Sequence, residues 1–461
     1  MVFVSDSFVF VFLPVFLIAY AAIPTALRNF TILAFSLVFY GWWRFDFLPL
    51  LVGISCWSWS TGLWISRAAG RGRRQALLAG IAPPICSLIY FKYANLLAES
   101  AANLGVSIEG WTAVPLPIGL SFFVFGAISY SVDVFRRTVA AETNMISYST
   151  YQAMFGHLVA GPIVRYQSVA RRLQSRVFDI AEFAEGWRRF MLGFSQKVLI
   201  ADTLAPLVDA GYSLPSLSSS DAIVTTVAFT LHLYFDFSGY SSMAIGLGLM
   251  VGLKFPENFA NPYLSTSLAE FWRRWHISLS SWLRDYLYIP LGGNRVARVR
   301  SNLNLLITMA LGGLWHGASW TFLIWGFWHG IGLVAGRIWT ALRLPAISPV
   351  LGHTMTIVFV MAGWILFRAQ DWQAAGTMFR GVIGSNGFPI SAGFAAAVRP
   401  IEILTLGLGI VIIYLPVLEK FSLRASVAID RPPFALAAML WLWSLWVIQN
   451  RTVIPFLYFQ F

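Results

Sequence analysis

Charged residues are scarce in this chain. Only 11% of its 461 residues are Asp, Glu, Lys or Arg, whereas 58% are hydrophobic and 16% are aromatic. Soluble globular proteins carry about 25% charged residues, so this composition excludes a soluble domain of this length. The chain is predicted to be an integral membrane protein.

Cysteine is almost absent. Cys56 and Cys86 both lie in apolar runs, without the spacing of a disulfide framework or of a zinc site. The histidines also lack a metal-binding spacing such as H-E-x-x-H. We therefore expect no bound metal.

Acidic residues are fewer than basic ones, 20 against 32, which gives a net charge of +12. In a soluble chain this excess would suggest nucleic acid. Here the basic residues lie in short loops: Arg28, the run from Arg67 to Arg74, and the pair Arg136 and Arg137 occupy alternate loops. Because short cytoplasmic loops are enriched in Lys and Arg, we expect these loops in the cytoplasm and no nucleic-acid partner.

Long apolar runs account for most of the chain. A helix crosses a bilayer with about 20 residues, so we expect roughly 10–12 helices in an all-α, polytopic transmembrane bundle, some of them re-entrant or amphipathic. The predicted spans are residues 8–26, 30–43, 46–66, 76–98, 114–132, 186–208, 222–252, 303–315, 318–336, 354–367, 401–418 and 434–448.

Residues 270–287 are predicted to form one amphipathic helix. At about 100° per residue, its aromatic and leucine side chains share one half of the helical wheel, and its charged side chains fall on the other half. Such a helix is too charged to cross a bilayer alone. His276 falls within the apolar half, which indicates a buried role.

No charged residue occurs from Ser301 to Gly336. The run is too long for one crossing at about 1.5 Å per residue, so we expect it to turn back. The predicted break is at Gly312-Gly313 or at His316-Gly317, because glycine tolerates irregular backbone. A histidine beside such a break at membrane depth, His316, is a candidate catalytic residue.

Three further features bear on function. His232 and Asp236 are four residues apart and share a helix face, either as an acid–base pair or as a polar contact that fixes helix register. The basic loop from Gly292 to Arg300 carries Arg295, Arg298 and Arg300, which suit the phosphates of a donor, although a charged cytoplasmic loop explains them about as well. The apolar stretch 155–166 is too short to span and is expected to be re-entrant or buried.

Several of these stretches together resemble one family. They are FVFVFLPVFLIAY, HLVAGPIVRY, YFDFSGYSSMAIGLG, FPENFANPY, FWRRWHISLSSWLRDYLYIPLGGNR, GGLWHGASWTFLIWGFWHG and GWILFRA, and in order they cover about four fifths of the chain. The chain resembles the membrane-bound O-acyltransferases, in their bacterial alginate O-acetyltransferase branch. One departure is Ser242, where relatives commonly carry an acid.

The resemblance implies a fold and a function. We expect one integral-membrane acyltransferase domain over residues 1–461, with its core at about 115–370, C-terminal helices over 371–461 and an intramembrane tunnel. No tightly bound cofactor is expected, and the donor substrate is expected to be acetyl-CoA. The acetyl group is expected to pass across the bacterial inner membrane to an exported polysaccharide such as alginate or cellulose, with periplasmic partner proteins and membrane lipids as partners.

The resemblance also places the family's near-invariant histidine on His316 and its second active-site position on His276. Burial keeps an imidazole neutral, so His316 is expected to act as general base, while His276 positions the donor or stabilises the oxyanion. Arg295, Arg298 and Asp236 are predicted to bind substrate. The alternatives are histidines that only pack helices, a partner protein or lipid as acceptor, or a secondary transporter, whose paired repeats are not visible here.

Overall fold

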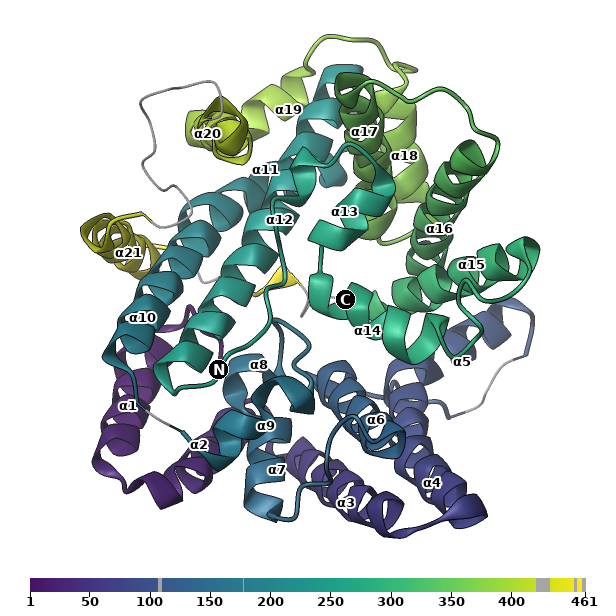
Figure 1. Cartoon of the computed structure of the whole chain (residues 1–461). Coiled ribbons are helices and arrows are strands. Elements are labelled where there is room, and N and C mark those ends of the chain that lie inside the picture. The colour runs from purple at the N-terminus through teal and green to yellow at the C-terminus, as the bar shows by residue number, and fades with distance from the viewer. Residues whose placement is uncertain (107–109, 177, 420–431, 452–453, 458–461) are drawn as a thin grey trace. The chain divides into compact units, whose positions relative to one another are not determined.

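The computed structural model describes residues 1–106, 110–176, 178–419, 432–451 and 454–457. Within these ranges the regular secondary structure is helical throughout, and no strand occurs (Figure 1). The prediction of an all-helical chain is confirmed.

The chain forms two compact units. The first consists of Met1–Phe190 with Ser241–Glu257, and the second of Met191–Tyr240 with Asn258–Phe461. Two helices, α10 (Ile180–Ser195) and α12 (Ser219–Met250), contribute residues to both units. The prediction of a single domain stays a prediction.

The first unit contains most of the short helices, with 3-10 and π-helical segments marked η. They are η1 (Ser7–Phe12), α1 (Leu13–Ala22), η2 (Thr25–Leu27), α2 (Arg28–Trp43), η3 (Phe45–Phe47), α3 (Leu48–Arg67), α4 (Gly70–Leu88), η4 (Ile89–Tyr93), α5 (Ala94–Asn103), α6 (Leu120–Arg136), α7 (Met145–Ala153), α8 (Phe155–Leu158) and α9 (Tyr166–Gln174).

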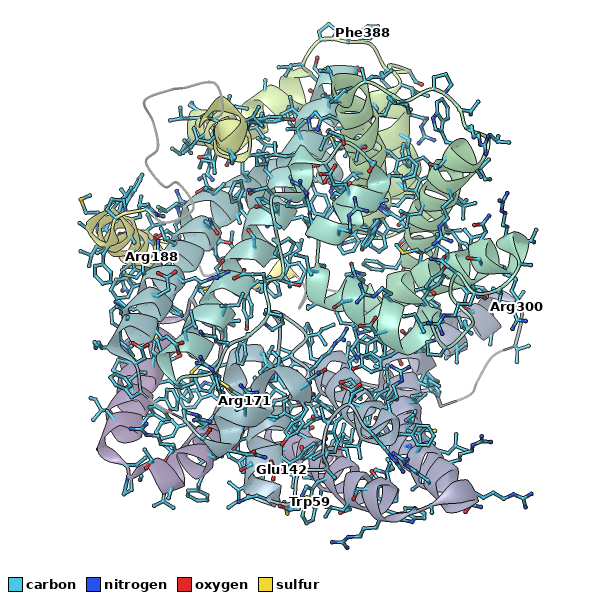
Figure 2. All side chains as sticks on the ribbon, in the orientation of Figure 1. Trp59, Glu142, Arg171, Arg188, Arg300 and Phe388 are labelled. Carbon is cyan, nitrogen blue, oxygen red and sulfur yellow. The ribbon has the colours of Figure 1, made fainter. Side chains whose placement is uncertain are left out.

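Helices α3, α4 and α6 pack side by side in the first unit (Figure 1). Small residues permit this approach, since a Cβ at Gly80 would lie 3.1 Å from the hydroxyl oxygens of Thr61 and Ser131. Between α6 and α7, Glu142 (Figure 2) is buried, and it accepts a hydrogen bond from the Tyr166 hydroxyl. The carboxyl of Glu142 is therefore held by the fold.

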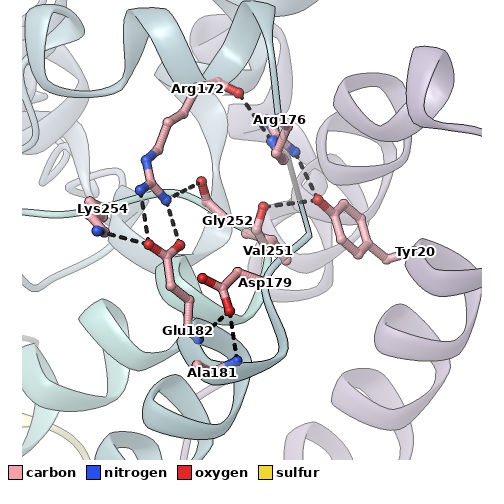
Figure 3. Close-up of polar contacts among 9 residues, drawn as sticks. All are labelled: Tyr20, Arg172, Arg176, Asp179, Ala181, Glu182, Val251, Gly252 and Lys254. Atoms are coloured by element: carbon pink, nitrogen blue, oxygen red, sulfur yellow. Dashed lines mark hydrogen bonds and ion pairs between the residues drawn. The ribbon is translucent and has the colours of Figure 1, made fainter.

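The basic stretch 167–189 lies in α9 and in the first part of α10, with a short connection between the two helices. Arg172 forms a bidentate pair with Glu182, with N–O distances of 2.6 and 3.0 Å, and Lys254 lies 2.8 Å from the same carboxylate (Figure 3). Arg176 donates to the Tyr20 hydroxyl at 3.2 Å. These arginines fasten the segment to its neighbours within the unit.

The stretch 155–166 contains only the four-residue helix α8, followed by irregular backbone. All of α8 is buried, and His157 packs edge-on against Phe255 at 5.1 Å between ring centroids. The prediction that this stretch is buried is confirmed.

The second unit holds the longer apolar helices of the second half of the chain. Its elements besides α10 and α12 are η5 (Gln196–Ala201), α11 (Asp202–Ser213), η6 (Pro262–Leu264), α13 (Leu268–Arg274), α14 (Ile277–Leu283), η7 (Arg284–Tyr288), α15 (Arg298–His316), α16 (Trp320–Ala341), α17 (Pro349–Arg368), α18 (Trp372–Val382), α19 (Ala392–Ala397), α20 (Pro400–Glu419) and α21 (Phe434–Gln449).

Every predicted span overlaps helical structure, although several are built from consecutive helices and the helix of the span 114–132 begins only at Leu120. Among the described residues, five helical stretches are long and apolar enough to cross a membrane, and two shorter apolar ones, Ser7–Ala22 and Phe434–Gln449, accompany them. The number of crossings stays a prediction. The five stretches are Phe45–Arg67, Gly70–Asn103, Ile180–Ser213, Pro349–Arg368 and Pro400–Val417.

Helices α15 and α16 form a close pair joined by a short loop (Figure 1). A Cβ at Gly313 would overlap the carbonyl oxygen of Phe322, and a Cβ at Gly326 would overlap that of Met309. Glycine is therefore required at both contact points, because any larger residue would push the helices apart.

Gly326→Ala is expected to lower the Tm of the purified protein in detergent, since overpacking costs about 1–3 kcal/mol. Gly336→Ala is the matched control on the same helix, because a Cβ at Gly336 meets no atom within 4 Å. The control is expected to keep or slightly raise the Tm, as alanine is the better helix former. Equal Tm values for the two variants would contradict the proposed close contact.

Candidate active site

His276 lies between α13 and α14 with φ 42° and ψ 54°, in the left-handed region. The predicted single helix over 270–287 is therefore wrong. The chain already leaves the helix at Trp275, which is extended. Left-handed backbone at a residue with a Cβ costs about 1–3 kcal/mol and persists only where the surroundings enforce it.

Asn258 supplies that enforcement. Its carbonyl oxygen accepts the Ile277 N–H at 2.9 Å, and its Oδ1 accepts the Ser278 N–H at 3.3 Å and the Ser278 hydroxyl at 2.8 Å. A further backbone bond runs from Ala260 N–H to the carbonyl of Arg274 at 3.0 Å. The loop after α12 thus holds the chain on both sides of His276.

The side-chain amide of Asn258 also determines which tautomer His276 adopts. The Asn258 Oδ1 already accepts a backbone N–H, so it acts as an acceptor toward the His276 Nδ1, which lies 3.1 Å away. The Nδ1 must therefore carry a hydrogen. Complete burial, through desolvation, lowers the pKa of His276 to about 3, so the ring is neutral and its Nε2 carries a lone pair. Among the described residues, this Nε2 has no hydrogen-bond partner.

His316 is the last residue of α15, and Gly317 after it is extended at φ −153° and ψ 147°. Of the two predicted breaks, the one at His316-Gly317 is therefore confirmed. Glycine is needed there because a Cβ would overlap the ring of Phe322. The His316 and His276 rings lie 6.1 Å apart between centroids, so the structure brings the two predicted catalytic residues together.

Aromatic rings surround both imidazoles. His316 lies edge-on to Trp325 at 5.1 Å and to Phe367 at 5.3 Å, while His276 lies edge-on to Phe237 at 4.7 Å. Such walls leave little room for water, and in an apolar setting each remaining polar atom acts strongly on a substrate.

His329 was not predicted as a site residue. It is fully buried on α16, its Nδ1 accepts a hydrogen bond from Trp272 Nε1 at 3.3 Å, and its ring lies 4.9 Å from Trp325. The sequence carried a signal, since the tripeptide Trp-His-Gly occurs at 315–317 and again at 328–330. The histidine of the second copy, His329, is separated from His316 by the ring of Trp325.

Asp236 is fully buried on α12, but its partner is not His232. Its Oδ1 lies 2.7 Å from the Nζ of Lys197, and its Oδ2 accepts the Leu457 N–H at 2.8 Å. No hydrogen bond joins the two side chains, so neither the acid–base pair with His232 nor the polar contact that would fix helix register is observed. A role for Asp236 in substrate binding stays a prediction.

Known proteins with similar sequences identify the family. The model of the membrane-bound O-acyltransferase family matches residues 84–373. A probable alginate O-acetylase of Azotobacter vinelandii is 42% identical, with all of both chains covered. The corresponding Pseudomonas aeruginosa protein is 45% identical over 92% of this chain and 82% of its own, and a peptidoglycan O-acetyltransferase of Helicobacter pylori is 33% identical over 84% and 80%.

The chain belongs to the membrane-bound O-acyltransferase family. It is thus a membrane-bound enzyme that transfers acyl groups, and the resemblance noted in the sequence is confirmed. His276 and His316 both lie inside the part that matches the family model. The assignment of catalytic roles to them stays a prediction.

Close to this histidine site, the acyltransferase has an open groove of about 1000 Å³ between α13, α14, α15, α16 and α17. Trp272, the residue bonded to His329, lines it. Of the predicted phosphate-binding residues, Arg298 lines the groove, whereas Arg295 and Arg300 do not. Sequence reasoning missed the other basic side chains that line it, which are Arg273, Arg284 and Arg337.

No group of three or more His, Cys, Asp or Glu side chains in the described residues is placed to hold a metal ion.

The groove suits an anionic, amphipathic molecule, since its lining combines arginines with apolar side chains such as Leu305, Leu333 and Phe359.

Asn258→Ala is expected to lower kcat about tenfold or more, because a small misplacement of a group in an active site can cost up to about 10²-fold. The KM of the donor should change little. Asn386→Ala is the control, since it also removes an amide that bonds to backbone, at Leu217, in an exposed loop of the same unit. An Asn258 variant with the same kcat as this control would refute a role for Asn258 in the site.

Proposed function

We propose that this acyltransferase moves an acetyl group from cytosolic acetyl-CoA to hydroxyl groups of an exported polysaccharide, in the bacterial inner membrane and together with periplasmic partner proteins. The observation that carries the proposal is the pair of buried imidazoles 6.1 Å apart inside the region that matches the family. Similar proteins named for O-acetylation of alginate and of peptidoglycan support a saccharide hydroxyl as acceptor.

In the proposed reaction His316 takes the proton of the attacking hydroxyl. The oxygen forms a bond to the thioester carbonyl carbon, the carbon–sulfur bond breaks, and the thiolate of coenzyme A receives the proton from His316. The products are the acetyl ester of the acceptor and the free thiol of coenzyme A. The surrounding aromatic rings favour transfer over hydrolysis because they keep water from the thioester.

The tautomer of His276 decides between its two expected roles, donor positioning and stabilisation of the oxyanion. A neutral imidazole whose Nδ1–H is committed to Asn258 offers only an acceptor at Nε2. It therefore suits donor positioning, by accepting an N–H or O–H of the substrate such as a pantetheine amide. The alternative expectation, donation to an oxyanion, would require a charged ring in a buried place.

The arginine-lined groove is the proposed site for the phosphates of coenzyme A. Arginine suits phosphate because its planar fork donates two hydrogen bonds at once. Arg298 lies on the first turn of α15, the helix that ends at His316, and Trp272 separates the groove from the aromatic rings around His316. Donor binding and catalysis would thus share one set of helices.

His316→Ala is expected to reduce transfer of radiolabelled acetyl from acetyl-CoA in inverted membrane vesicles by about 10²–10⁴-fold, the range for loss of a general base. The comparison is made at matched expression, with folding checked by size-exclusion chromatography. Label in a polysaccharide supports the proposal, whereas label that ends in a protein or lipid identifies a different acceptor. Wild-type transfer without dependence on His316 excludes the assigned base, and no transfer with partners present favours a transporter.

Arg298→Ala is expected to raise the KM of acetyl-CoA about tenfold with kcat little changed, since a charge-assisted hydrogen bond contributes about 1.5–3 kcal/mol. Arg300→Ala is the matched control, because Arg300 lies on the same helical turn but outside the groove lining and projects from the edge of the structure (Figure 2). If both variants raise KM equally, the effect belongs to general surface charge and not to the groove.

A further inference from the structure

Lys197, Asp202 and Asp236 form a buried ionic cluster outside the histidine site. Lys197 is 1% exposed and Asp236 is 0% exposed, and the Lys197 Nζ also pairs with Asp202. Buried ions are expensive to desolvate, and within apolar helices they usually serve a function. Neither histidine of the proposed reaction uses this cluster.

The backbone around Lys197 is adapted to this contact. Lys197 belongs to the π-helical segment η5, and π-helical turns occur preferentially at functional sites. A Cβ at Gly239 of α12 would lie 2.6 Å from the carbonyl oxygen of Gly193, so the two helices approach through glycines one turn away. The approach brings the ammonium within 2.7 Å of the Asp236 carboxylate.

The second oxygen of Asp236 binds a remote segment. Oδ2 accepts the Leu457 N–H at 2.8 Å, so the segment Ile454–Leu457 is tied to the middle of α12. The neighbouring Phe456 is fully buried and stacks on Tyr240 at 4.5 Å between ring centroids. Lys197 orients the carboxylate, and the carboxylate holds the segment.

A single ring, that of Phe237, separates Phe456 from His276. Its centroid lies 5.9 Å from that of Phe237, and Phe237 lies edge-on to His276 at 4.7 Å and to Phe259 at 5.0 Å. Phe259 directly follows Asn258, the residue that fixes the His276 tautomer. One ring, Phe237, is therefore confined between Phe456 and the histidine.

From these contacts we infer that Phe456 is a positioning residue of the site. The Lys197–Asp236 pair anchors Ile454–Leu457, Phe456 fixes the ring of Phe237, and Phe237 holds the imidazole of His276 in place and shields it from water. The catalytic consequence rests on the proposed function, but the shielding of His276 does not.

The test compares Phe456→Ala with Phe394→Ala. Phe394 is 2% exposed and lies on α19 of the same unit. It makes no ring contact with the site within the described part of the chain, so it controls for loss of a buried phenylalanine. We expect Phe456→Ala to lower kcat about tenfold or more with KM for acetyl-CoA unchanged, because small misplacements at a site cost up to about 10²-fold. Phe456→Leu, which refills the space, should recover most of the kcat.

A second readout is independent of acyl transfer. Diethyl pyrocarbonate modifies neutral imidazoles, and peptide mass spectrometry separates modification of His276 from that of His329, which is equally buried. Phe456→Ala should raise modification of His276 several-fold and leave His329 unchanged, whereas Phe394→Ala should change neither. If the alanine variants do not fold, Phe456→Val and Phe394→Val, which leave part of the space empty, serve for the comparison.

The outcomes separate the two proposals. If the His276 modification in Phe456→Ala equals that in Phe394→Ala, the positioning role is overturned, whatever the activity. If wild-type protein transfers no acetyl from acetyl-CoA yet the modification rises as expected, the proposed function fails and the structural inference stands. Equal losses of kcat and Tm in both alanine variants also overturn the inference, since they indicate general destabilisation.

Discussion

The site depends on the hydrogen bonds that Asn258 accepts from residues 276–278. The side chains of residues 270–287 follow a helical pattern, so the local sequence favours a continuous helix, and the left-handed backbone of His276 opposes that preference. The asparagine supplies an alternative set of bonds for the broken helix. Without them the imidazole would follow the helix surface and lose its orientation toward His316.

The second constraint is the close packing of α15 on α16. Glycines at 313 and 326 let the backbones touch, and Gly317 turns the chain directly after His316. The histidine is thereby placed at a helix end that is buried by Trp325 and Phe367, where irregular backbone is tolerated because protein surrounds it. The two imidazoles are thus oriented by different causes. Hydrogen bonds to Asn258 orient His276, whereas glycines that let the backbone pack closely place His316.

The sequence alone sufficed for features that depend on local pattern. Long apolar runs located the helices, and a charge-free run too long for one crossing limited the turn to Gly312-Gly313 or His316-Gly317. It did not suffice where a contact joins distant residues. A helical wheel assumes an unbroken helix, so it could not show the break at His276, which Asn258 enforces from 18 residues earlier along the chain. Asp236 was paired with the nearby His232, whereas its actual partner Lys197 lies on another helix.

Hydrolysis competes with acyl transfer, and a site poor in polar groups limits this competition because it admits little water. Aromatic rings exclude water but also deprive buried ions of solvation, so each remaining proton must have a defined position. At His276 that position is fixed because Nδ1–H points to Asn258, which leaves a single acceptor toward the site. Lys197 compensates the charge of Asp236 within the ionic cluster, so the Asp236 carboxylate can anchor a segment of chain although it is buried.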